Sequence, residues 1–154
     1  MAMGGIPYYL QQIVPGESAA QVIDRLCFTK DGLLQKEFNN LYESLFANSE
    51  QHEKVIRALA QKGKGLTRQE IIEQCGFTTG GSTSKILNEL DESGFITSYM
   101  PFGKTANEGV YKLSDEYSLF YLKFIEGAKA TGAGTWLRRI NTASYLSSCG
   151  FSFE

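Results

Sequence analysis

The 154-residue chain has few histidine and cysteine side chains, the usual soft ligands of metals. It contains one histidine, His52, and three widely spaced cysteines, Cys27, Cys75 and Cys149. Zinc sites take about four such ligands, so this set is too small for one and we expect no bound metal. The odd cysteine count favours reduced, mostly buried thiols. A catalytic Cys-His pair is the alternative, but no cysteine lies in a nucleophile motif.

Long apolar runs are also absent. No stretch approaches the roughly 18 apolar residues that a membrane span needs, and the N-terminus MAMGGIPYYL lacks the basic start and long apolar stretch of a signal peptide. We therefore expect a cytoplasmic protein with no membrane partner. A hydrophobic content of 42% is typical of globular proteins.

The chain has no excess of basic residues and no complete active site. Its net charge of -2 argues mildly against nucleic acid, because free-standing DNA-binding domains are usually basic. The sequence PFGK at 101–104 lacks the glycine spacing of a phosphate loop and is interpreted as a turn. Helix capping explains the carboxylate pairs at 91–92 and 115–116 better than acid-base catalysis. We expect no catalytic residues and no enzyme activity.

Residues 1–48 are predicted to form a small helical subdomain. Pro7 suits the first turn of a short helix, and Ser18 is placed to cap a second helix that ends near Phe28. A third amphipathic helix is predicted from an apolar stripe at helical spacing, namely Leu34, Phe38, Leu41, Leu45 and Phe46.

Residues 49–114 have the order of elements of a winged helix-turn-helix. A helix beginning near Ser49 stops at a glycine-rich stretch, and Thr67 with Glu70 forms the capping box of a second helix. A third helix begins at 80–82 and closes at 93–94. Two short strands at 95–99 and 110–113 then predict a β-hairpin, the wing. The expected fold is mainly α with a small β-hairpin wing.

Residues 115–154 begin with a helix capped by Asp115. Its face is unusually aromatic and must pack on something, since it carries Tyr117, Phe120, Tyr121, Phe124 and Ile125. The tail starts glycine-rich and is predicted to become helical from Trp136 to Leu146.

In a DNA-reading winged helix the N-terminal half of the third helix enters the major groove. The reading residues would then be Ser82, Thr83, Ser84, Lys85 and Asn88. Backbone phosphates would be held by nearby cations, namely Lys54, Arg57, Lys62, Lys64 and Arg68, with Lys104 at the hairpin tip. Glu89, Asp91 and Glu92 oppose this interpretation. The alternative, that all of these are solvated surface residues, stays open.

Four stretches resemble the C-terminal part of the archaeal-type ATPases, prokaryotic ATP-binding proteins of the AAA/STAND group. They are GGIPYYL at 4–10, LLQKEFNNLYESLF, the segment from GLTRQEI to SGFI, and DEYSLFYLKFIE. In that family a P-loop domain precedes a helical lid and a winged helix, and a nuclease-like domain often follows. Gly5 and Pro7 match the family's Gly-x-Pro element, whose proline resembles a contact to the nucleotide base.

The resemblance implies a lid at 1–48, a winged helix at 49–114, and the start of a following domain within 115–154. The Walker A lysine and Walker B acid of the family would lie upstream, so we expect a fragment that binds no cofactor and hydrolyses no ATP alone. ATP and Mg²⁺ are implied for the full-length relative.

Three functions remain open from the sequence. The winged helix is either a DNA-binding module coupled to nucleotide state, or a docking module for the missing ATPase and nuclease-like domains or for a partner protein. A free-standing winged-helix transcription regulator is the third. The docking hypothesis takes the acidic third helix and the aromatic face at 117–125 as the docking surfaces. It expects an exposed apolar patch and allows a homodimer.

Overall fold

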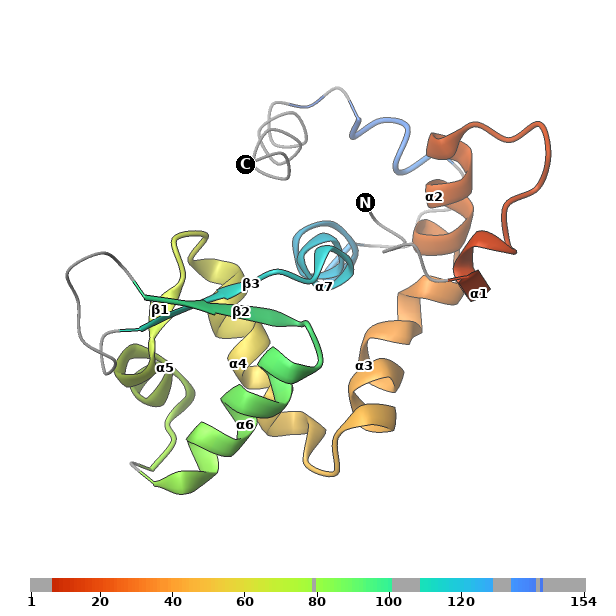
Figure 1. Ribbon diagram of the computed structural model, residues 1–154. Helices are drawn as coiled ribbons and strands as arrows, with labels where there is room; N and C mark the ends of the chain where they lie inside the picture. Colours follow the sequence, from red (N-terminus) through yellow and green to blue (C-terminus); the bar gives the residue numbers. More distant parts are fainter. Residues whose placement is uncertain (1–6, 79, 101–108, 129–133, 141, 143–154) are drawn as a thin grey trace. The chain divides into compact units, whose positions relative to one another are not determined.

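Figure 1 shows a computed structural model of the chain, which describes residues 7–78, 80–100, 109–128, 134–140 and 142. The protein is mainly helical, as the sequence predicts, and it contains a small antiparallel sheet of three strands where a two-stranded hairpin was expected. It divides into two compact units: unit 1 comprises Met1–Asn40 and Phe120–Glu154, and unit 2 comprises Leu41–Leu119. None of the described helices has the length and apolar character required to span a membrane.

Unit 1 begins with two helices at the positions that the sequence predicts. Helix α1 spans Pro7–Leu10, and α2 spans Ala19–Phe28. The Ser18 hydroxyl accepts from the Gln21 N–H, and the Gln21 side chain reaches back to the Ser18 N–H, which completes a capping box. Helix α3, Leu33–Leu45, starts in the same unit.

The core of unit 1 is built around the single tryptophan. The Trp136 ring stacks on Phe28, with centroids 5.4 Å apart, and makes T-shaped contacts with Phe120 and Phe124. The buried Asp24 carboxylate of α2 accepts the backbone N–H groups of Gly134 and Trp136, the latter at 2.7 Å. A buried carboxylate must have its hydrogen bonds satisfied, so Asp24 fixes the tail against α2.

The C-terminal elements differ from the predicted helices. Helix α7 spans Glu116–Phe120, and its N-terminus is capped by Asp115, whose carboxylate accepts from Ser118 N–H at 2.7 Å. The chain then continues as a π-helix over Tyr121–Ile125. The helix predicted from Trp136 to Leu146 is not found in its described part, because 134–140 form successive turns held by Asp24.

The apolar stripe of α3 is corrected at its C-terminal end. Leu34 and Phe38 are buried as predicted, but Leu45 is 53% exposed and Tyr42 is fully buried in its place. The Tyr42 hydroxyl lies 2.7 Å from the Ser118 hydroxyl, and its ring packs on Phe95. A buried tyrosine needs a hydrogen-bond partner for its hydroxyl. The spacing of apolar residues along the sequence does not indicate such a partner.

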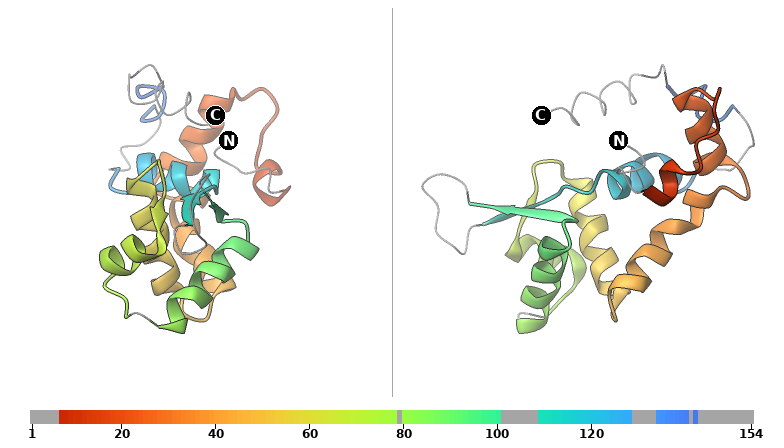
Figure 2. Two further views of the ribbon diagram at one scale, coloured as in Figure 1. Left: turned by 60° about the vertical axis from the view of Figure 1, so that its left-hand side comes forward. Right: turned by 45° about the vertical axis from the view of Figure 1, so that its right-hand side comes forward.

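Unit 2 alternates short helices and strands. Its elements in chain order are α4 (Ser49–Gln61), β1 (Leu66–Thr67), α5 (Arg68–Cys75), α6 (Gly81–Glu92), β2 (Ile96–Tyr99) and β3 (Val110–Leu113). The strands are antiparallel in the order β1-β3-β2, with Ile96 opposite Leu113. Figure 1 shows α5 and α6 on the same side of the β2-β3 hairpin, and Figure 2 shows the hairpin from two further directions.

The sequence does not predict β1, the two-residue strand that pairs with β3. It is preceded by Gly65, whose φ is +85° and which approaches the opposite strand closely. A Cβ atom at Gly65 would lie 2.6 Å from the Tyr111 carbonyl oxygen. The glycine-rich stretch therefore both ends α4 and brings the chain against β3.

The N-terminal capping box of α5 matches the prediction. The Thr67 hydroxyl accepts from Glu70 N–H, the Glu70 carboxylate accepts from Thr67 N–H at 2.8 Å, and Gly76 ends the helix with φ +67°. The backbone bond from Thr67, followed by the bond from its hydroxyl, lowers the pKa of Glu70. A lowered folded-state pKa stabilises the protein above the unfolded value, about 4.3, and this contribution is lost as the pH falls.

Replacing Glu70 with glutamine keeps an acceptor for Thr67 N–H but removes the titration. We expect the free energy of unfolding of Glu70→Gln to depend less on pH than that of the wild type between about pH 5 and 3. Urea unfolding followed by circular dichroism measures this. Glu73→Gln, on the same helix but outside the cap, is the matched control. Equal pH dependence in the wild type and Glu70→Gln would contradict the assignment.

Candidate nucleic-acid interface

Helix α6 has one buried face and one exposed face. Its buried residues are Thr83, Ile86, Leu87 and Leu90. Ser82, Lys85 and Asn88 are exposed and recur at intervals of three, so they lie along the opposite side of the helix. Because the apolar side fixes the rotation of the helix, these three residues form its outer face.

The N-terminus of α6 is held by Arg68 at the start of α5. The Arg68 guanidinium donates to the Gly80 carbonyl at 3.1 Å and to the Ser84 hydroxyl at 3.3 Å. Arg68 was predicted to contact a phosphate, but its guanidinium already holds two groups of this protein. No side chain caps the helix at Gly80.

The C-terminus of α6 is closed by a Schellman motif. Gly94, with φ +77°, donates to the Asp91 carbonyl, and Phe95 N–H donates to the Leu90 carbonyl, both at 3.0 Å. The Asp91 carboxylate accepts from the Ser98 hydroxyl at 3.0 Å and from its N–H at 3.3 Å, which ties α6 to β2. Both ends of the helix are thus fixed within unit 2.

His52 on α4 links the core to the outer side of α6. Its ring is 2% exposed and stacks on Phe46, with centroids 4.0 Å apart. Nδ1 lies 3.0 Å from the Asn48 carbonyl oxygen, and Nε2 lies 2.8 Å from Glu89 Oε2. The other Glu89 oxygen lies 3.7 Å from Lys85 Nζ.

The predicted reading residues do not all reach the surface. The Lys85 side chain is 77% exposed and Ser84 is half-buried. Thr83 is a correction: it is fully buried, with its hydroxyl directed at the Thr78 carbonyl oxygen 3.5 Å away, so it has no surface to offer a duplex. Lys104 lies outside the described residues.

Of the two residues matched to the nucleotide-lid element, the structure describes only Pro7. Gly5 lies outside the described residues. Pro7 is exposed at the first position of α1 in unit 1, where the sequence predicts a helix start. The described part of the structure records no contact that would show a role for its ring.

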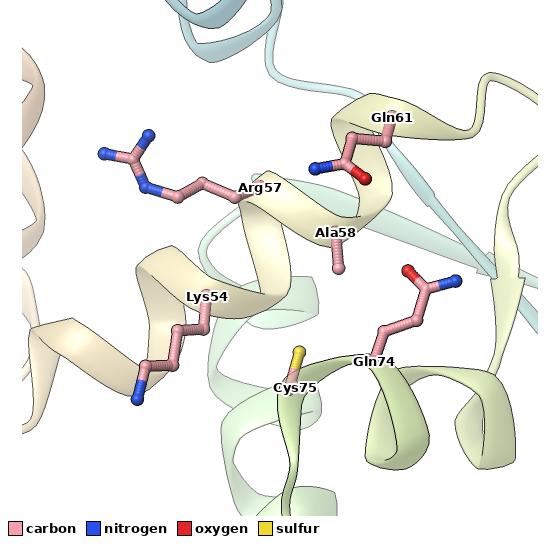
Figure 3. Close-up of a pocket in the computed structure, with 6 residues that line it drawn as sticks. All are labelled: Lys54, Arg57, Ala58, Gln61, Gln74 and Cys75. Carbon is pink, nitrogen blue, oxygen red and sulfur yellow. The ribbon is translucent and has the colours of Figure 1, made fainter.

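The remaining predicted phosphate contacts lie around α4. Lys54 and Arg57 border a groove of about 430 Å³ between α4 and α5, with Arg57 3.6 Å from Glu53. Figure 3 shows the side chains of Gln61 and Gln74 on opposite walls of this groove, while Lys54 and Arg57 extend away from it. Lys62 Nζ lies 3.7 Å from the Glu70 carboxylate, and Lys64 is exposed.

The two described cysteines are free thiols without nucleophilic character. Burial, followed by the negative charge of Asp24, raises the pKa of Cys27 to about 12. Burial also raises the pKa of Cys75, which lines the groove. A reactive thiol needs the opposite shift. Within the described ranges, no three His, Cys, Asp or Glu side chains gather as a metal site would require.

Comparison with known proteins gives no relative. No protein-family model, curated protein or solved structure matches the chain. The resemblance to archaeal-type ATPases therefore stays a prediction.

The two Arg68 hydrogen bonds predict a local effect of Arg68→Ala. We expect faster amide hydrogen exchange in the first turn of α6 and a loss of about 1 kcal/mol in the free energy of unfolding. Exchange followed by NMR measures both effects. Lys54→Ala, which removes an exposed cation of α4 in the same unit, is the control. Unchanged exchange at 81–85 would show that Arg68 does not hold α6.

Proposed function

We propose that unit 2 is a winged helix-turn-helix domain that binds duplex DNA with the outer face of α6. The element order helix, strand, two helices and a two-stranded hairpin supports the fold assignment, as does the pairing of the short first strand with the last. In this arrangement α6 is the recognition helix, α5 supports it, and the β2-β3 hairpin is the wing.

The observation that carries the proposal is the chemistry of the outer face of α6. A hydroxyl, an ammonium and a carboxamide are exposed on one side, at Ser82, Lys85 and Asn88. Lysine donates to guanine O6 and N7, asparagine pairs with adenine N6 and N7, and serine suits either base. The helix N-terminus at Gly80 has no side-chain cap, and its positive end favours a phosphate.

The acidic residues of α6 repel DNA phosphates less than their number suggests. Glu89 is bonded to His52 and lies beside Lys85. Asp91 is bonded to Ser98 of β2. Two of the three carboxylates thus have partners within unit 2. The attraction of a phosphate depends on the charges near it more than on the net charge of the chain.

The proposal predicts salt-dependent binding that requires Lys85. Wild-type protein should bind a mixed-sequence fluorescent duplex with micromolar affinity at about 50 mM salt, and the affinity should fall by orders of magnitude at about 200 mM. Lys85→Glu, alone or with Lys104→Glu, should abolish this binding. Fluorescence anisotropy at both salt concentrations measures the effect.

Lys36→Glu is the matched control, because it makes the same charge change at an exposed position on α3. It should reduce affinity far less than Lys85→Glu. No wild-type binding at either salt concentration, or equal losses in the two variants, would contradict DNA binding by α6.

A second candidate function is docking on a partner protein, with a different surface from the one that the sequence indicates. The aromatic face at 117–125 is covered by the chain itself: Tyr117, Phe124 and Ile125 are buried, and Tyr121 stacks on Phe38. The large exposed apolar side chains of unit 1 instead concentrate within seven residues near its start, at Tyr8, Leu10, Ile13 and Val14.

The docking function predicts that a charge in this segment changes association. Ile13→Asp should abolish any self-association of the wild type at high concentration, measured by sedimentation velocity. Leu137→Asp, at another exposed leucine of unit 1, is the control. A wild type that stays monomeric at high concentration would count against a homodimer formed through the 8–14 segment.

On the resemblance alone, we propose that DNA binding is coupled to the nucleotide state of an ATP-binding protein of the AAA/STAND group, with the lid at 1–48. The start of α1 at Pro7 is compatible with the lid element. Because the phosphate and magnesium ligands of that family match no residues here, the chain alone should not bind a fluorescent ATP analogue. Tight binding would contradict this view.

A further inference from the structure

Glu89 is a carboxylate held in one position at the edge of the outer face of α6. Its side chain is 36% exposed. One oxygen lies 2.8 Å from Nε2 of His52, and the other lies 3.7 Å from Nζ of Lys85. Glu92, one turn further along the same helix, is exposed.

The partner that holds Glu89 is itself held by its surroundings. The His52 ring is 2% exposed, stacks on Phe46, and is bonded to the Asn48 carbonyl through its other nitrogen. A side chain fixed by a buried partner loses little conformational freedom when it binds a ligand. Glu89 therefore offers a pre-oriented acceptor, with the Lys85 ammonium as a donor beside it.

We propose that Glu89 and Lys85 together read one C·G base pair in the major groove. This inference rests on the proposed DNA binding by α6. The major-groove edge of a C·G pair presents the cytosine N4 amino donor beside the guanine O6 and N7 acceptors. The Glu89 carboxylate would accept a hydrogen bond from cytosine N4, and the Lys85 ammonium would donate to guanine O6 or N7. Each group on the helix thus faces its complement on the base pair.

The inference also gives a role to an acidic residue on a surface that would face the phosphates of DNA. A carboxylate near DNA is repelled by the backbone unless it gains a specific donor. Cytosine N4 is the base donor for which aspartate and glutamate are the usual readers. His52 is then a positioning residue, which acts on the base through Glu89.

Selection from a random-sequence duplex library, followed by sequencing of the bound fraction, tests the inference. Wild-type protein should enrich a C·G pair at one fixed position by about tenfold, the discrimination expected of one well-placed base contact. Glu89→Ala should lose that enrichment, while Glu92→Ala, which removes the same charge from an exposed residue one turn further along α6, should keep it.

Two further variants separate readout from folding. Glu89→Gln keeps an oxygen acceptor for His52, and glutamine reads adenine, so the enrichment should move from C·G to an adenine at that position. His52→Phe leaves the Glu89 charge in place but removes its anchor, and should lower the C·G enrichment without abolishing binding. Circular dichroism of each variant establishes that it is folded.

The failures of the two proposals are distinguishable. Bound duplexes without a fixed C·G pair, or the same pair enriched by Glu89→Gln as by the wild type, would overturn the readout and leave DNA binding standing. No bound fraction with the wild type would overturn DNA binding by unit 2, and the readout with it.

Discussion

The rotation of α6 about its own axis is the constraint on which the proposed interface depends. Four buried residues fix which side of the helix faces the core, and polar contacts then hold its two ends. Arg68 holds the first turn, and the Asp91 contact with Ser98 holds the last. Because such a helix can present only one face, the chemistry of Ser82, Lys85 and Asn88 defines what it can bind.

Most of the secondary structure follows from capping residues and periodicity. Ser18, Thr67 and Asp115 each cap the helix predicted for them, and the hairpin strands lie within a residue of their predicted positions. Long-range contacts account for the differences. The strand β1 exists because Gly65 permits close approach to β3, and the tail forms turns because Asp24, more than a hundred residues away in sequence, accepts its N–H groups.

The candidate site is only partly visible in the sequence. Helical spacing places Lys85 and Asn88 on the surface, and it also shows that Thr83 falls on the same side as Ile86 and Leu87. The partners of Arg68 and Glu89 cannot be inferred this way. His52 is 37 residues from Glu89, and periodicity within one helix does not indicate its contacts with another. The assignments of 1–48, 49–114 and 115–154 as separate domains stay predictions.

The most direct test of the central claim is an NMR titration of the ¹⁵N-labelled protein with duplex DNA at low salt. The account predicts that the amide signals of Ser82, Lys85 and Asn88 shift most, with those of the first turn of α6, while signals of α2 stay unchanged. Shifts confined to residues 8–14, or no shifts at a saturating concentration of DNA, would contradict the assignment of α6 as the nucleic-acid interface.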